Sequence, residues 1–532
     1  MSKSLRHWWL LVFCVLVPLQ PAMAADAAPS RLASVAWLQE NMQRDDVVLI
    51  DASPPQLHAA GHIPGATNVD LFSFGGLDVT PAEMERRIQS WGLGDGTKVV
   101  LYDQGGTYLA TSLFFDLYYH GIPAANLVIL DGGLAKWQAA GGAVTKEPTP
   151  ARKAGTFKVT RLREEVRVRL PEFLVASGDP ANNALVEALD PVQHFGAMKF
   201  FDRAGHIPNA VMSPGADYFN ADKTFKSPEE IRRMLAYLGV KPGQQVLTHC
   251  GGGIAASVPF FAAKFMLDYP RVKLYKESQL EWMRDDRVLP LWTYDAPQMT
   301  RDKAWLNGWG NVMMRRYGVS KLVVIDVRPE AAFKQSHLPF AINIPGDAFR
   351  RNVATPEKLA QMLGAAGVDA AVEAVIVSQG GLTPDAALAF LMLEKLGQKR
   401  VSIFAETVDD WGFAGFPLEK EASTSASNAP TTYPAHLRLE NKDALYPKVY
   451  VASGKALPAK LPEGKVVHVP YTELLNDNGT PKAAKDLWTI LTKAGVPRYA
   501  EIVSVSDDPG EAAATYFILK LMGYPDVKVP AS

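Results

Sequence analysis

The chain has 532 residues, 48% of them hydrophobic, and its 55 basic and 56 acidic side chains give a formal net charge of −1. At about 100–200 residues per domain, this length predicts three to five domains. Near-neutral charge gives no support to a nucleic-acid or membrane-surface role, because such proteins carry a basic excess.

Residues 1–24 carry the pattern of a secretory signal peptide. A positive start precedes an apolar run over 8–17, and a small-x-small cleavage site follows at 22–24. The apolar run is well short of the ~20 residues that a transmembrane helix needs. We therefore expect an exported, periplasmic chain with no membrane partner after cleavage, in which Cys250 is the one remaining cysteine.

One segment recurs four times with different chemistry at its end. In each copy an apolar, strand-like run leads into a polar or Gly-rich loop and then into an Ala-rich or aromatic helical stretch. The copies lie at 99–107, 246–253, 375–382 and 503–511. We align Gln104, Gln379 and Asp507 with Cys250, and none of these three side chains can supply a thiolate.

Further elements repeat in step with this segment. Upstream in three copies, a short apolar strand ends in an acid and is followed by a His-Ile-Pro or His-Leu-Pro turn; the fourth copy keeps only 467–470. The acids are Asp51, Glu187 and Asp326, and the histidines are His62, His206 and His337. Downstream stand Trp137, Trp282 and Trp411. Because the histidine recurs in copies without a nucleophile, we expect it to have a structural role at a turn.

The alternation of strands and helical stretches indicates an α/β fold, with a mainly parallel sheet in each copy. In such sheets functional sites lie at the carboxyl ends of the strands, where Cys250 is expected. The predicted domains are 30–148, 160–293, 298–420 and 433–532. Linkers are expected at 147–153, 289–297 and 421–432.

The Cys250 loop has the most informative chemistry of the chain. Three glycines follow the cysteine, and 255–266 is predicted to be helical. A loop of this kind before a helix can turn several N–H groups toward an anion, and it favours a thiolate that is nucleophilic at neutral pH. A buried structural cysteine is the usual alternative for a lone thiol. The glycines argue against it, because a core cysteine needs no backbone with positive φ.

The His-Ile-Pro turn, the strand-to-Cys loop and the acidic or Gly-Gly element before a tryptophan resemble the rhodanese family of sulfurtransferases. The resemblance implies four tandem rhodanese-like units. As in two-domain members of the family, the first would be inactive and the second catalytic; the third and fourth would be added inactive copies. The loop from Cys250 to Ala255 is similar to Cys-Gly-Ser-Gly-Val-Thr of mercaptopyruvate sulfurtransferases, with Gly252 in place of Ser.

The resemblance also implies a reaction. The Cys250 thiolate would take sulfur from a small anionic donor, either thiosulfate or 3-mercaptopyruvate, and pass it from a persulfide to cyanide or a thiol acceptor. Backbone amides would hold the anionic sulfur, and Arg203, where the family carries an arginine facing the site, would bind the donor; its alternative is a surface charge. No cofactor or metal is expected. The loop residues concerned are Gly251, Gly252, Gly253, Ile254 and Ala255.

Two other functions are considered. His249, Cys250 and Ser257 superficially match a cysteine-phosphatase loop, but Ala256 stands where that loop needs an arginine to grip phosphate. A sulfur carrier or interaction scaffold without steady turnover is the second alternative, because three copies lack a nucleophile. Turnover with excess donor and cyanide separates a carrier from an enzyme.

Overall fold

The computed structural model describes residues 31–74, 79–420, 430–437 and 444–530. The predicted signal peptide and most of the 421–432 linker lie outside the described residues. The described chain contains four separate sheets, and every pair of neighbouring strands within them is parallel. This confirms the predicted α/β class with parallel sheets flanked by helices. We call the parts built on the four sheets units 1 to 4.

Unit 1 has a five-stranded sheet in the order β1-β5-β4-β2-β3. Its interior strand β2 is buried throughout, as expected for a parallel strand covered on both faces by helices. The strands are β1 (Leu32–Ala33), β2 (Val47–Asp51), β3 (Thr67–Asn68), β4 (Lys98–Tyr102) and β5 (Leu127–Leu130). The helices are α1 (Val35–Asn41), α2 (Pro55–Ala60), α3 (Pro81–Ser90), α4 (Leu109–Tyr119) and α5 (Gly133–Ala139).

Unit 2 repeats this topology in the order β6-β10-β9-β7-β8. The strands are β6 (Arg167–Val168), β7 (Asn183–Glu187), β8 (Ala210–Met212), β9 (Gln245–His249) and β10 (Val272–Tyr275). The helices are α6 (Leu170–Ser177), α7 (Pro191–His194), α8 (Pro228–Tyr237), α9 (Ser257–Phe261) and α10 (Ser278–Arg284). The helix predicted over 255–266 begins later, at Ser257, and continues as a π-helix over Ala262–Met266.

Unit 3 has the same strand order, β11-β15-β14-β12-β13, whereas unit 4 has four strands in the order β17-β16-β18-β19. The unit 3 strands are β11 (Thr300–Arg301), β12 (Leu322–Asp326), β13 (Ala341–Asn343), β14 (Glu373–Val377) and β15 (Arg400–Phe404). Its helices are α11 (Lys303–Gly310), α12 (Val312–Arg316), α13 (Glu330–Gln335), α14 (Gly346–Arg351), α15 (Pro356–Ala365), α16 (Pro384–Lys395) and α17 (Val408–Phe413). Unit 4 comprises β16 (Lys448–Ala452), β17 (Lys465–His468), β18 (Glu501–Val505), β19 (Val527–Lys528), α18 (Ala484–Ala494) and α19 (Pro509–Leu521).

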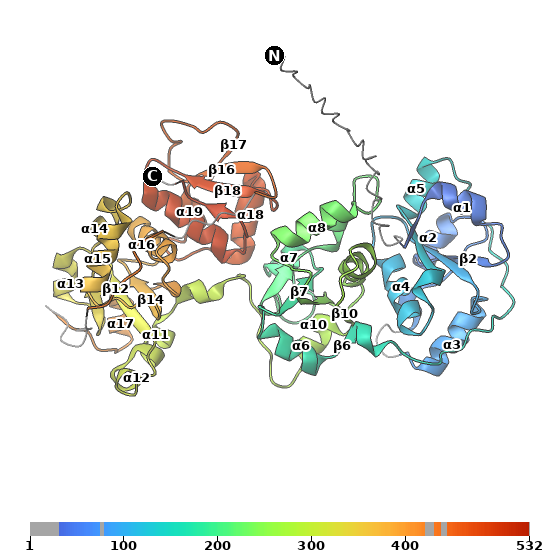
Figure 1. Cartoon of the computed structure of the whole chain (residues 1–532), viewed down its shortest axis with the longest axis horizontal. Coiled ribbons are helices and arrows are strands. Elements are labelled where there is room, and N and C mark those ends of the chain that lie inside the picture. Colours follow the sequence, from blue (N-terminus) through green and yellow to red (C-terminus); the bar gives the residue numbers. More distant parts are fainter. Residues whose placement is uncertain (1–30, 75–78, 421–429, 438–443, 531–532) are drawn as a thin grey trace, which may run out of the picture.

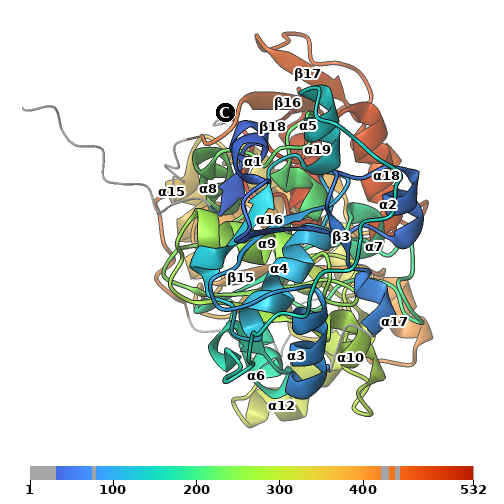
Figure 2. The ribbon, with the colours of Figure 1, turned by 90° about the vertical axis from the view of Figure 1, so that its right-hand side faces the viewer.

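The units associate in pairs. One buried apolar cluster spans units 1 and 2, where α4 meets α9 and Phe114 packs edge-on against Phe261 with ring centroids 5.1 Å apart. A second spans units 3 and 4, where α16 meets α19 and Phe390 meets Phe517 at 4.9 Å. The long axis of the molecule runs from unit 1 to units 3 and 4 (Figure 1), and the other units lie behind unit 1 when the molecule is viewed from that end (Figure 2).

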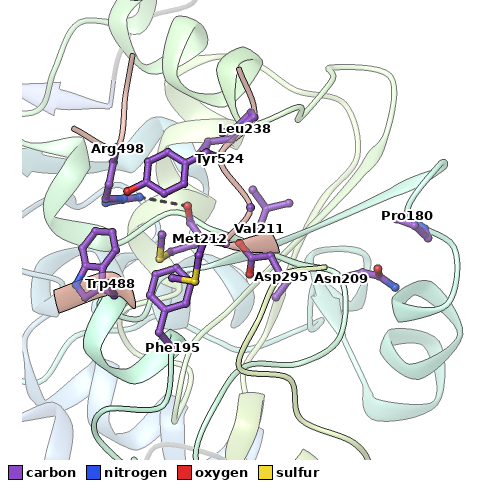
Figure 3. A pocket seen from close by; sticks show the side chains of 14 residues that line it. Pro180, Phe195, Asn209, Val211, Met212, Leu238, Asp295, Trp488, Arg498 and Tyr524 are labelled. Carbon is purple, nitrogen blue, oxygen red and sulfur yellow. Dashed lines mark hydrogen bonds between the residues drawn. The ribbon is translucent and has the colours of Figure 1, made fainter. Parts of the chain in front are cut away.

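Units 2 and 4 join the two pairs. Arg498 of unit 4 forms an ion pair of 2.6 Å with Asp217 of unit 2, and the Tyr237 hydroxyl donates to the Ala500 carbonyl at 2.8 Å. A cavity of about 220 Å³ lies at this junction. Figure 3 shows Arg498 beside Tyr524 on its wall, donating a hydrogen bond to the Met212 carbonyl.

The predicted histidine turns are found in units 1 to 3. His62, His206 and His337 are buried, and the backbone of each forms an isolated antiparallel bridge to a residue after the last helix of its unit. In each ring Nδ1 lies 2.8–2.9 Å from a carbonyl oxygen four or twelve residues earlier. These contacts close the chain around the turn, which is the structural role that the repeats indicate.

Among the described residues, no helix is both long and apolar enough to cross a membrane.

Candidate active site at Cys250

Cys250 follows the last residue of β9 and lies at the carboxyl end of the unit 2 sheet. Its side chain is 3% exposed. The backbone is fixed by the connection between β10 and α10: the Cys250 N–H donates to Ser278 Oγ at 3.1 Å, and its carbonyl accepts from the Gln279 N–H at 3.1 Å. The thiol therefore sits on a rigid backbone in the place where parallel sheets carry their sites.

Gly253 is the residue of the loop that the geometry requires to be glycine. Its N–H donates to Cys250 Sγ at 3.1 Å, which is the direct contact between loop and sulfur. Its φ of +80° is rarely adopted by other residues, and a Cβ there would lie 1.8 Å from the Lys276 carbonyl oxygen. Gly252 has open space around it, whereas a Cβ on Gly251 would meet the ring of Phe200 at 2.4 Å.

A cavity of about 570 Å³ opens from Cys250 between units 1 and 2. Of the predicted site residues, Cys250, Gly251, Gly252, Ile254 and Ala255 line it, and Gly253 stands behind the sulfur. Unit 1 lines the opposite wall with Pro54, Leu57, Phe72, Gln104, Gly106, Thr107, Tyr108 and Leu109. The remaining lining residues of unit 2 are Ala188, Leu189, Asp190, Gln193, Phe200, Gly215, Ala216, Phe219 and Val258.

Arg203 does not line this cavity. Its guanidinium donates to the Leu289 carbonyl at 2.8 Å and to the Met283 carbonyl at 3.4 Å. These bonds fix one end of the turn that carries Phe200 over the loop. The expectation that Arg203 binds the donor stays a prediction. Arg203 can affect the cavity only indirectly, through the position of Phe200, which lines the wall.

The strand register corrects the alignment of the four loops by one position. His249, the last residue of β9, pairs with Glu187; in the same way Tyr102 pairs with Asp51, and Val377 with Asp326. The residues after these strand ends, and after Val505 in unit 4, are the true equivalents of Cys250: Asp103, Ser378 and Ser506. The predicted Gln104, Gln379 and Asp507 are therefore each one residue too late, although none of the correct residues is a thiol either.

Asp103 shows what the loop holds when an anion stands in the cysteine position. Its carboxylate is buried and accepts from the backbone N–H groups of Gly105, Leu109 and Ala110 at 2.8–3.1 Å. It also accepts from the Thr107 hydroxyl at 2.6 Å. The strand–loop–helix unit of this fold thus places several donors around a negative charge at this position.

A buried ionic cluster lies on the other face of the unit 2 sheet, behind the Cys250 loop. His194 bridges two carboxylates, with Nδ1 2.5 Å from Glu187 and Nε2 2.6 Å from Asp295. Burial alone lowers the pKa of His194, but these carboxylates outweigh burial and raise it to about 9. Glu187 also accepts from Gln279, the residue whose N–H holds the Cys250 carbonyl.

Two further histidines of this cluster are neutral at neutral pH. Burial, reinforced by the charge on His194, lowers the pKa of His206 to about 4. Burial likewise lowers the pKa of His249 to about 4, and neither of its ring nitrogens has a hydrogen-bond partner. His249 packs against Phe173 with ring centroids 5.2 Å apart, so it ends the strand as part of the core rather than facing the cavity.

The ligand atoms of His194, His206 and Asp295 lie within 4.8 Å of one another, a spacing that could suit a metal ion. The two imidazoles, however, stack at 3.7 Å with an interplanar angle of 3°. Both Nε2 atoms lie near the same Asp295 oxygen, His194 at 2.6 Å and His206 at 3.3 Å, and the His194 Nε2 carries a proton at neutral pH. The arrangement fits a hydrogen-bonded ion cluster better than a metal site.

The sequence did not reveal the wall of the cavity. Phe200 and Phe219 come from irregular segments of unit 2, and Phe72 comes from unit 1. The one available signal in the sequence was the adjacent aromatic pair Phe200–Phe201 just before the histidine turn; the structure exposes both rings, and apolar side chains exposed together often mark a site.

Comparison with known proteins decides the family. A probable 3-mercaptopyruvate sulfurtransferase from Pseudomonas aeruginosa is 30% identical over 288 residues, which cover 48% of this chain and 96% of the relative. This chain belongs to the rhodanese-like sulfurtransferase family. The family model of the rhodanese-like domain matches residues 34–140 and 312–414 of this rhodanese-like protein, in units 1 and 3.

Other relatives match about the same share of this rhodanese-like protein. The sulfur carrier protein TtuD of Thermus thermophilus is 29% identical over 276 residues, 48% of this chain and 94% of its own length. A thiosulfate sulfurtransferase of Pseudomonas aeruginosa is 29% identical over 246 residues, 44% of this chain and 88% of its own. Among solved structures, an anaerobic ergothioneine biosynthesis enzyme from Chlorobium limicola aligns with a TM-score of 0.45 and 24% identity, over 49% of this chain and 70% of that one.

Proposed function

We propose that this protein is a sulfurtransferase that moves a sulfane sulfur through a persulfide on Cys250. The observation that carries the proposal is the position of the thiol: it ends a parallel strand, receives a hydrogen bond from the Gly253 N–H, and opens into a cavity between two units. Sulfur transfer itself is the common activity in the names of the relatives.

The proposed donor is a small anion, thiosulfate or 3-mercaptopyruvate, and the proposed acceptor is cyanide or a thiol. The Cys250 thiolate attacks the outer sulfur of the donor, sulfite or pyruvate leaves, and the acceptor then removes the sulfur in a second step. The Gly253 N–H is placed to stabilise negative charge on Cys250 Sγ in both steps. Loop residues Gly251, Gly252, Ile254 and Ala255 supply the adjoining surface.

A turnover assay tests the proposal. Wild-type protein with excess thiosulfate or 3-mercaptopyruvate and cyanide should form thiocyanate over many cycles, and Cys250→Ser should lose activity by ~10³-fold or more, as expected for a nucleophile. Ser257→Ala, which removes a hydroxyl that donates to the Ile254 carbonyl without touching the sulfur, is the matched control and should retain activity. Wild-type rates in Cys250→Ser would overturn the mechanism.

The second candidate is a sulfur carrier without steady turnover, and the similarity to a protein named as a sulfur carrier favours it. A carrier loads Cys250 once and discharges only to its partner. One equivalent of sulfite or pyruvate, with no thiocyanate beyond that equivalent, would identify it.

The organisation proposed with this function is four rhodanese-like units with the predicted boundaries 30–148, 160–293, 298–420 and 433–532. Four parallel sheets, three of them in one strand order, support it. Asp103, Ser378 and Ser506 leave units 1, 3 and 4 without a thiol at the Cys250 position. We also propose a periplasmic location after cleavage of residues 1–24; N-terminal sequencing of the native protein should find a chain that begins at Ala25.

A further inference from the structure

The cavity at Cys250 is much larger than the smallest molecules that the proposed reaction uses. Its volume of about 570 Å³ lies in the range of roughly 300–1,000 Å³ that is usual for pockets that bury an organic ligand. A water molecule takes about 30 Å³ of liquid, and even thiosulfate, with its five heavy atoms, takes only a few times that volume. Cyanide or thiosulfate would leave most of the cavity filled with water.

The wall of the cavity is mainly apolar, although Gln104, Thr107, Tyr108 and Gln193 add uncharged polar groups to it. Phe200 lies against Gly251, and Phe219 and Phe72 line other parts of the wall. Leu57 and Val258 add aliphatic surface from the two units. Such a wall gains free energy by removing carbon from water, and it gives nothing to a small, strongly hydrated anion.

The only charged side chain among the described residues that line the cavity is Asp190. A sulfonate or carboxylate seated along this wall would lose water without meeting a cation, and it would face a carboxylate. The polar side chains of the wall are uncharged, so an anionic end meets no opposite charge along it. The wall therefore suits the sulfur acceptor rather than the anionic donor.

The two steps of the reaction share one cavity, because Cys250 is the thiol on which both occur. We propose that the acceptor is an organic thiol with a bulky apolar group, aromatic or branched, and with no anionic group. This inference rests on the proposed function and specifies the acceptor class within it. The apolar group would lie along Phe200, Phe219 and Phe72, with its sulfur directed at Cys250.

The transfer step balances without any further reactant. The acceptor thiolate attacks the outer sulfur of the Cys250 persulfide, the S–S bond of the persulfide breaks, and the electron pair of that bond returns to Cys250 Sγ. The overall change is Cys250–S–SH + R–S⁻ → Cys250–S⁻ + R–S–SH. The proton stays on the transferred sulfur, and no net oxidation occurs.

The test measures discharge of the persulfide form in single-turnover experiments. The full chain is loaded with thiosulfate or 3-mercaptopyruvate and freed of donor. It is then mixed with benzyl mercaptan, 2-mercaptoethanesulfonate or cyanide, and loss of the extra sulfur is followed by mass spectrometry of the Cys250 peptide. Because the persulfide is already formed, these rate constants do not depend on the donor. Benzyl mercaptan should discharge the protein about 10-fold faster than the sulfonate, after correction for the fraction of each thiol that is ionised.

Variants test which residues cause the preference for an apolar thiol. Phe200→Ala should lower the ratio of the benzyl mercaptan to the cyanide rate constant by about 10-fold, because it removes the ring against the loop. Phe201→Ala is the matched control: this ring is also partly exposed, lies next to Phe200 and does not line the cavity. It should leave the ratio within about 2-fold of wild type. Asp190→Asn keeps a side chain able to cap α7 and should raise the sulfonate rate constant by about 2-fold.

The outcomes separate the inference from the function on which it rests. If neither donor loads Cys250, the proposed function fails and the inference with it. If Cys250 is loaded and cyanide discharges it, but the two thiols react equally or the sulfonate reacts faster, the function stands and the inference is overturned. An unchanged ratio in Phe200→Ala, with an unchanged thermal midpoint, overturns it as well.

Discussion

The Asp103 loop of unit 1 and the Cys250 loop of unit 2 have the same backbone plan and different uses. Each follows the strand that pairs with a buried acidic residue, and each has a glycine with positive φ three residues on, Gly106 and Gly253. In unit 1 the anion is a carboxylate that backbone N–H groups hold as part of the core. In unit 2 the same position holds a thiol that opens into a cavity, and unit 1 supplies the facing wall.

The comparison teaches that the loop plan can hold a negative charge whether or not a thiol occupies it, and catalysis is proposed only where a thiol does. It also suggests a structural reason for unit 1, proposed to be inactive, to lie beside unit 2. Units 1 and 2 share one apolar core through α4 and α9, and the cavity exists only because they do.

Replacing Gly253 of the Cys250 loop should have the largest effect on activity. Gly253→Ala puts a Cβ into the Lys276 carbonyl and moves the N–H that contacts the sulfur. A shift of about 1 Å at a reacting group costs ~10²-fold, so kcat/KM should fall by about that factor. Gly252→Ala, in open space, should stay within about 3-fold of wild type. Equal losses in both variants would show that the loop does not hold the sulfur as described.

Removing the carboxylate of unit 1 tests the other side of the comparison. Asp103→Ala leaves three backbone N–H groups without an acceptor, and each unsatisfied buried group costs about 1–3 kcal/mol. We expect the free energy of unfolding to fall by about 3 kcal/mol, measured by urea titration. Ser378→Ala, the equivalent change in unit 3, removes a hydroxyl with two backbone contacts and should cost about 1 kcal/mol. If Asp103→Ala costs no more than Ser378→Ala, the cradle has no special affinity for an anion.

The histidine cluster behind the Cys250 loop should make the stability of unit 2 depend on pH. The folded-state pKa of His194, about 9, is above its unfolded value of 6.5. Its contribution to stability is therefore fully present below pH 6.5 and is lost as the pH rises to about 9. The expected loss over the whole window is about 3 kcal/mol.

His194→Gln should flatten the decline of stability between pH 6.5 and 9, as measured by urea titrations across that window. His58→Gln is the matched control, because His58 follows Asp51 in unit 1 as His194 follows Glu187 in unit 2. That variant should keep the decline. A decline that survives in His194→Gln would assign the titration to another group.

Arg203 should give the smallest effect. Its bonds to the Met283 and Leu289 carbonyls hold the turn that carries Phe200, so Arg203→Ala should act on the wall of the cavity from a distance. We expect KM to rise about 3-fold with kcat little changed, and the thermal midpoint to fall by a few degrees. Arg203→Lys, which can keep one of the two bonds, should have a KM between those of Arg203→Ala and wild type. Wild-type kinetics in Arg203→Ala would leave this residue with a purely structural role.

The sequence was sufficient for the fold class, the repeats and the placement of Cys250 at a strand end. Apolar runs ending in Asp51, Glu187 and Asp326 mark strands that the structure contains. The loop alignment was wrong by one residue, because register is set by hydrogen bonds between strands and an apolar run alone does not fix it.

The rest of the site depends on contacts between distant parts of the chain. The wall formed by Phe72 and Leu57 exists only once α4 meets α9, and the Arg498–Asp217 ion pair joins residues 281 positions apart. His194 is perturbed by Asp295, which comes from the predicted linker after unit 2. No local pattern predicts such pairs, since each side chain is unremarkable in its own segment.

The central claim is that Cys250 carries sulfur covalently and that the equivalent residues of the other units do not. Incubation with thiosulfate or 3-mercaptopyruvate, followed by peptide mass spectrometry without reductant, tests it most directly. We predict a gain of one sulfur, ~32 Da, on the Cys250 peptide of wild-type protein and on no other peptide, and none in Cys250→Ser. A donor-dependent gain that persists in Cys250→Ser, or thiocyanate formation without any gain on Cys250, would contradict the account.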